Sequence, residues 1–163
     1  MSVAALFGLS VLMSFLAFGL VTKLYIWPWV RVMPREDALT ALVVPHTFRF
    51  IGLSFLVPGV VSPSLSRDFA GPAAYGDLIA AVLAVIATLA LRARASWAIA
   101  IVWVFNVWGA FDLLNAIYNG QIGVGISPAS LGAAFYIPTV LVPPLLITHG
   151  LIFWILLRQP KQA

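Results

Sequence analysis

The sequence predicts an all-α, polytopic membrane protein, a bundle of five transmembrane helices, and two observations carry this prediction. Of 163 residues, 63% are hydrophobic and only 9% are charged, and the mean hydropathy is +1.07. Soluble domains carry about 25% charged residues, so this composition excludes a water-soluble globule. The chain also offers five apolar segments of the length, roughly 20 residues, that a membrane-spanning helix needs. We therefore expect residues 1–163 to form a single transmembrane helical domain.

The expected spans have ordinary helix boundaries. They lie at about residues 3–24, 38–60, 74–92, 96–119 and 129–157. Pro34 and the acidic residues after it are typical of the first turn of the second span. Gly120 follows the fourth span, and Ser127 before Pro128 predicts the start of the fifth. Residues 1–22 lack the basic segment and cleavage site of a signal peptide, so we interpret them as the first span.

The basic residues predict an orientation. Five spans place most of them on one face, and a single one, Arg67, on the other. The residues expected on the basic face are Lys23, Arg31, Arg35, Arg92, Arg94, Arg158 and Lys161. Because basic loops stay cytoplasmic, the N-terminus is expected outside and the C-terminus in the cytoplasm. The predicted location is the inner (plasma) membrane, as a multi-pass protein.

Polar side chains inside such apolar spans are the candidate functional residues, since each is costly to bury in a bilayer. Arg49 and Asp112 are expected to be the embedded ionisable pair. The third span is nearly free of polar residues apart from Thr88, which predicts a peripheral packing role. The full set consists of His46, Thr47, Arg49, Asn106, Asp112, Asn115, Thr139, Thr148 and His149.

The expected distance of each residue from the cytoplasmic face divides these residues into two zones. At about 1.5 Å per residue, His46 and His149 both lie about 12 Å from the cytoplasmic face. Arg49 lies about 16 Å and Asp112 about 24 Å from that face. The gap of about 8 Å is compatible with a direct ion pair or with a bridging water or ligand. The inner zone comprises His46, Arg49, His149 and Asn106, and the outer zone comprises Asp112, Asn115, Asn119 and Tyr118.

The leading functional hypothesis is the binding of a small lipophilic or amphipathic ligand between spans 2, 4 and 5; its conversion or transport stays open. The expected polar lining is His46, Arg49, Asn106, Asp112, Asn115 and His149. Arg49 would hold a negative or carbonyl group, a histidine would exchange a proton, and Asp112 would orient a partner. The Pro143-Pro144 pair is expected to kink the fifth span and open the cavity.

Two other classes of function stay open. Matched histidines on two spans suit axial ligation of a b-type haem by His46 and His149, in quinone-linked electron transfer. A non-catalytic membrane subunit or assembly factor is the third class, as part of a homo-oligomer or a larger membrane complex. The sequence has no cysteine and no third ligand near the histidines, so no metal site is predicted. It also carries no hydrolase or NTPase motif and no surface for nucleic acid, and whether the protein is an enzyme stays open.

Overall fold

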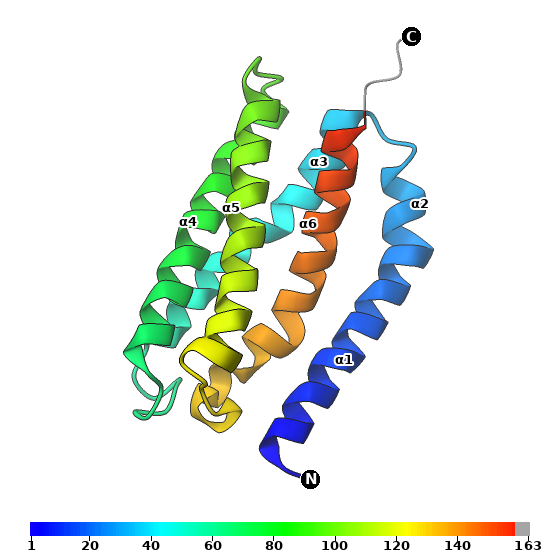
Figure 1. Cartoon of the computed structure of the whole chain (residues 1–163). Coiled ribbons are helices and arrows are strands. Elements are labelled where there is room, and N and C mark those ends of the chain that lie inside the picture. Colours follow the sequence, from blue (N-terminus) through cyan, green and yellow to red (C-terminus); the bar gives the residue numbers. More distant parts are fainter. Residues whose placement is uncertain (159–163) are drawn as a thin grey trace.

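The computed structural model describes residues 1–158. The regular elements in this range are helices, and none of them is a β-strand. The elements are α1 (Val3–Val21), η1 (Thr22–Ile26), α2 (Trp27–Val30), α3 (Arg35–Val43), η2 (Val44–Leu56), α4 (Arg67–Arg92), α5 (Ala98–Tyr118), η3 (Asn119–Gly123), η4 (Pro128–Phe135), η5 (Ile137–Leu141) and α6 (Val142–Leu157). They combine into five long helical stretches that run roughly parallel or antiparallel to one another (Figure 1).

Five helical stretches are long and apolar enough to cross a membrane, which agrees with the predicted number. They run over Val3–Val30, Arg35–Leu56, Arg67–Arg92, Ala98–Gly123 and Ile137–Leu157. We call the end of the bundle that holds Arg35, Arg92 and Arg158 the basic end. Chain direction alternates, so the N-terminus lies at the opposite end from the last residues of α6 (Figure 1). Lys161, counted among the basic residues, lies outside the described residues.

Two predicted boundaries are wrong. The third helix begins at Arg67 and not near residue 74, because Ser66 caps it by accepting a hydrogen bond from the backbone of Asp68. Pro72 is tolerated inside this helix, near its start. The segment expected at the start of the fifth span lies in another element, η4, which is kinked at Gly132, where φ is +54°.

The first span is also longer than predicted. The helix continues through η1 to Val30, so Lys23 lies well inside the helical segment and not next to its end. This span has the smallest buried share of the five, and α1 has no buried residue. Aromatic contacts attach it to the fifth span at both ends: Trp27 packs on Trp154, and Phe7 packs on Phe135 of η4.

The third span, α4, is central, which corrects the expectation that it packs at the periphery. It has the largest buried share of the five spans and contacts η2, α5 and α3. Eight of the twelve residues on its buried face are alanines: Ala70, Ala73, Ala74, Ala80, Ala81, Ala84, Ala87 and Ala90. Small residues let helices in a membrane approach each other closely. This face therefore brings the polar side chains of neighbouring helices within reach of each other.

The second span changes its winding halfway along. After α3, the thirteen residues of η2 form a 3₁₀ helix that starts at Val44-Pro45. A 3₁₀ helix rises about 2.0 Å per residue, against about 1.5 Å in an α-helix. The change displaces residues of η2 toward the end opposite the basic end. It also gives this span an unusually long 3₁₀ segment beside the polar site described next.

Candidate functional site

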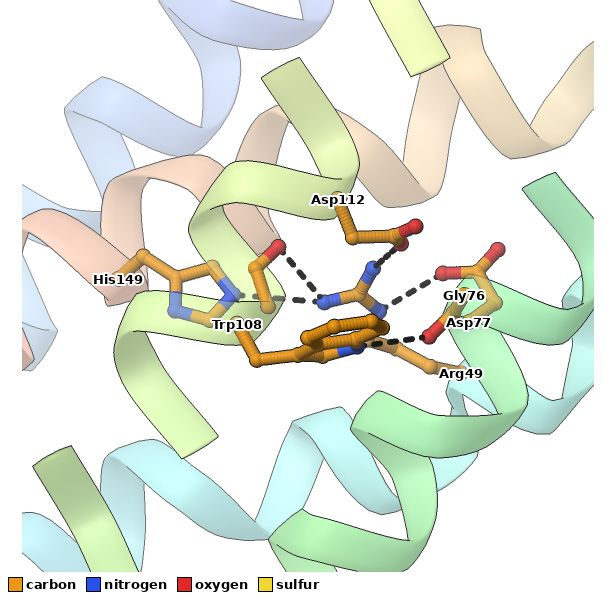
Figure 2. A network of polar contacts seen from close by, with 7 residues as sticks. Arg49, Gly76, Asp77, Trp108, Asp112 and His149 are labelled. Carbon is orange, nitrogen blue, oxygen red and sulfur yellow. Dashed lines mark hydrogen bonds and ion pairs between the residues drawn. The ribbon is translucent and has the colours of Figure 1, made fainter. Parts of the chain in front are cut away.

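The centre of the bundle holds a buried ionic network around Arg49 (Figure 2). The side chain of Arg49 is 1% exposed. Its Nε donates to Asp77 Oδ1 at 2.7 Å, and its Nη2 donates to Asp112 Oδ2 at 2.6 Å. Its Nη1 donates to the carbonyl oxygen of Gly109 at 3.0 Å and lies 3.5 Å from His149 Nε2. Every nitrogen of the guanidinium thus has a partner, and residues from four spans meet at one side chain.

Asp77 is the functional residue that sequence reasoning missed. The predicted span began near residue 74, which placed Asp77 close to a helix end and left Arg49 and Asp112 as the only embedded ionisable groups. With the helix starting at Arg67, Asp77 lies about 15 Å along it. The signal was present in the sequence, since Ser66 followed by Arg67 and Asp68 is typical of a capped helix start.

The contact between Arg49 and Asp112 is direct, so no bridging group is needed to join them. The predicted depth gap of about 8 Å assumed α-helical rise throughout the second span. The 3₁₀ winding of η2 carries Arg49 about 2–3 Å further toward Asp112. The extended guanidinium spans the remaining distance. Asp112, expected in the outer zone, is therefore joined directly to Arg49 of the inner zone.

Three glycines create the space that this network occupies. A Cβ at Gly52 would clash with the Asp77 carboxylate, and one at Gly76 would overlap the carboxylate of Asp112. A Cβ at Gly109 would lie 2.7 Å from His149 Cε1 and 2.8 Å from Arg49 Nη1. Each glycine belongs to one of the three helices that supply the charged groups.

The two histidines lie in contact, with ring centroids 4.2 Å apart. His149 Nδ1 is 2.7 Å from Asn106 Oδ1, so we assign the proton to Nδ1, which leaves Nε2 to accept from Arg49. His46 Nε2 lies 2.9 Å from the Thr148 hydroxyl, and that hydroxyl itself donates to the helix backbone. His46 Nδ1 is buried without a hydrogen-bond partner in the described part of the chain.

This arrangement does not fit a haem held between the two histidines. Axial ligation requires the porphyrin and its iron to lie between the imidazoles. Ring centroids 4.2 Å apart leave the rings in direct contact, closer than the usual spacing of aromatic pairs, about 4.5–7 Å. Within residues 1–158, no three histidine, aspartate or glutamate side chains gather in a way that could hold a metal ion.

A cavity of about 490 Å³ lies beside the network, toward the end opposite the basic end. Its wall is largely apolar and comes from α1, α4, α5 and the segments η4 and η5, with Phe55 from the second span. Asp77 and Asp112 are the charged residues that line it. Pro138, within the π-helical turn η5, and Val142, directly after it, also line the cavity. Of the residues predicted to line a cavity, Asp112 does so, whereas Arg49, His46, Asn106, Asn115 and His149 do not.

The remaining predicted site residues are divided between the network and its surroundings. His46, Asn106 and His149 are buried next to Arg49. Asn115 instead accepts a hydrogen bond from Asn119 at 3.1 Å, and it lies outside the ionic network. Trp108 donates from Nε1 to the carbonyl oxygen of Gly76 at 3.4 Å, beside Asp77 (Figure 2).

The fold and this site define an all-helical bundle with a buried arginine–dicarboxylate network and an adjoining apolar cavity. Over residues 6–157 the chain matches the family model described as "Domain of unknown function (DUF8737)", and it belongs to that family. No curated protein and no solved structure matches the chain.

Proposed function

We propose that this chain is an integral membrane protein that binds a small lipophilic or amphipathic ligand in the cavity beside Asp77 and Asp112. The single observation that carries the proposal is the cavity itself, about 490 Å³ with two carboxylates in an otherwise mostly apolar wall. Ligand sites are typically 300–1,000 Å³ and combine apolar walls with a few placed polar groups. Ionisable groups within a membrane bundle also favour a functional site.

The proposal differs from the sequence hypothesis in the place of the cavity, which the first and third spans also line, and in the group that meets the ligand. Each guanidinium nitrogen of Arg49 has a protein partner and Arg49 does not line the cavity, so the carboxylates take the role of ligand contact. A bundle that served only as a subunit or assembly factor would have no need for such a cavity. The orientation proposed is the one expected from the sequence, with the N-terminus outside, the C-terminus cytoplasmic and an inner (plasma) membrane location.

Photolabelling with a neutral lipophilic probe, an alkyl-phenyl diazirine, tests the proposal in protein reconstituted into lipid nanodiscs. We expect the probe to label Ala73 and Leu113, which line the cavity and are 6% and 3% exposed. Peptide mass spectrometry identifies the labelled residues. The substitution Ala116→Phe should abolish this labelling, because Ala116 lines the cavity and the larger ring would fill part of it.

Ala100→Phe is the matched control, since Ala100 is exposed on the same helix and lies away from the cavity. It should leave the labelling of Ala73 and Leu113 unchanged. Labelling confined to lipid-facing side chains in the unmodified protein would refute the proposed function, as would equal labelling in the Ala116→Phe variant.

A further inference from the structure

The charges of the buried network do not balance. Arg49 contributes one positive charge, and its two ion-pair partners, Asp77 and Asp112, carry two carboxyl groups. Among the described residues, no second cationic side chain forms an ion pair with either carboxylate. His149, the nearest titratable neighbour, accepts from Arg49 and so is assigned as neutral. The site therefore has a formal surplus of one negative charge when both carboxylates are ionised.

The surplus charge lies where a ligand can reach it. Nε and Nη2 share one edge of the planar guanidinium, so Asp77 and Asp112 lie side by side along that edge. Each uses one oxygen for Arg49. The second oxygen faces a glycine of a neighbouring helix, Gly52 for Asp77 and Gly76 for Asp112, and receives no hydrogen bond within residues 1–158. Both side chains are nine-tenths buried, at 10% exposure, and both line the cavity.

The apolar wall around the two carboxylates indicates which kind of cation would fit the cavity. Burying a carboxylate without a partner is costly, so a positive charge with hydrogen-bond donors is the complementary group. The described residues provide no cluster of three metal-ligating side chains, which disfavours a metal ion. The rest of the wall, including Phe55, Phe69 and Leu113, is apolar and suits a hydrocarbon or aromatic body. A cation with such a body satisfies both parts of the site.

We infer that the ligand is a lipophilic organic cation, an amine carried on an apolar body, whose ammonium group binds between Asp77 and Asp112. This inference rests on the proposed function, because it names the chemical class of ligand for the same cavity. Arg49 then acts as a positioning residue that holds the two carboxylates side by side.

The test compares three diazirine photoprobes that share one phenyl-alkyl body and end in an ammonium, a hydroxyl or a carboxylate group. The full-length protein in nanodiscs should be labelled at Ala73 and Leu113 by the ammonium probe at about one-tenth of the concentration that the hydroxyl probe requires. A tenfold ratio corresponds to about 1.4 kcal/mol. The carboxylate probe should label these residues least.

Two variants remove the surplus charge and keep Arg49 compensated. Asp77→Asn and Asp112→Asn each leave the arginine one carboxylate partner. In either variant the ammonium probe should lose its advantage over the hydroxyl probe, while the hydroxyl probe still labels the cavity. Continued labelling by the hydroxyl probe also shows that the variant is folded. If both variants fail to fold, the three-probe comparison on the unmodified protein still decides the question.

The outcomes separate this inference from the proposed function. Equal labelling by the ammonium and hydroxyl probes would overturn the cationic ligand and leave the lipophilic cavity in place. An ammonium preference that persists in both Asn variants would also overturn it. If none of the three probes labels Ala73 or Leu113, the proposed function fails and the inference fails with it.

Discussion

At the scale of single residues, the network depends on Arg49 more than on any other side chain. Its guanidinium joins the second span to α4 through Asp77 and to α5 through Asp112 and the Gly109 carbonyl. A buried ion pair contributes modestly to net stability, but removing one partner leaves the other charge uncompensated. In this site that penalty applies to two carboxylates at once.

We therefore expect Arg49→Met to lower the free energy of unfolding by about 3–5 kcal/mol. Titration of the purified protein with sodium dodecyl sulfate measures this quantity. Adding Asp77→Asn and Asp112→Asn to the same chain should restore much of the loss, because the unpaired charges are then gone. Arg94→Ala is the control: Arg94 pairs with Glu36 and Asp37 at the surface and is 55% exposed, so its loss should be far smaller. Unchanged stability of Arg49→Met would contradict the role given to this residue.

At the scale of elements, close approach of the helices is what lets the charged groups meet. The alanine face of α4 and the glycines at positions 52, 76 and 109 remove side-chain bulk where Asp77, Asp112 and Arg49 lie. Gly76 of α4 has especially little space around it, because its Cα faces the Asp112 carboxylate.

Gly76→Ala should accordingly weaken the packing of α4 against α5. A methyl group at this position overlaps the Asp112 carboxylate, and overpacking of this kind costs about 1–3 kcal/mol. Gly71→Ala, on the same helix, has open space around its Cβ and should be neutral or stabilising by up to about 1 kcal/mol. The same detergent titration compares the two variants. Equal effects of the two substitutions would show that the space at Gly76 is not required.

The number of spans was predicted correctly, because the length of an apolar segment is a local property of the sequence. A direct ion pair between Arg49 and Asp112 was one of two predicted possibilities, because charges embedded in apolar spans are rare and stand out in the sequence. The shared depth of His46 and His149 was also predicted, and the rings are in contact. Asp77 and the central place of α4 were missed. The third span was predicted to begin near residue 74, whereas the helix runs from Arg67 without a break at Pro72, and an alanine-rich face has no polar signal. The 3₁₀ winding of η2 has no clear sequence signature, and it sets the depth of Arg49.

At the scale of the whole molecule, five spans of alternating direction separate the charges into two ends. Arg31, Arg35, Arg92, Arg94 and Arg158 lie toward the basic end, whereas Arg67 begins α4 at the other end (Figure 1). The cavity extends from the central carboxylates toward the end that carries Arg67. In the proposed orientation, with the basic end in the cytoplasm, the proposed ligand would approach from the outer half of the bilayer. The weakly packed α1, which contributes Ala4, Phe7, Gly8 and Val11 to the wall, is the side of the cavity most easily displaced.

The absence of cysteine from the sequence allows this orientation to be tested without background labelling. Ser64→Cys and Ser96→Cys form a matched pair, because both serines are exposed and they lie in loops at opposite ends of the bundle. We expect a membrane-impermeant maleimide to label Ser64→Cys in intact cells, and to label Ser96→Cys only after the membrane is permeabilised. The reverse pattern would place the cavity on the cytoplasmic side and would contradict the orientation drawn from the basic residues. Labelling of both variants in intact cells would argue against a spanning bundle, because it would place the two loops on the same side of the membrane.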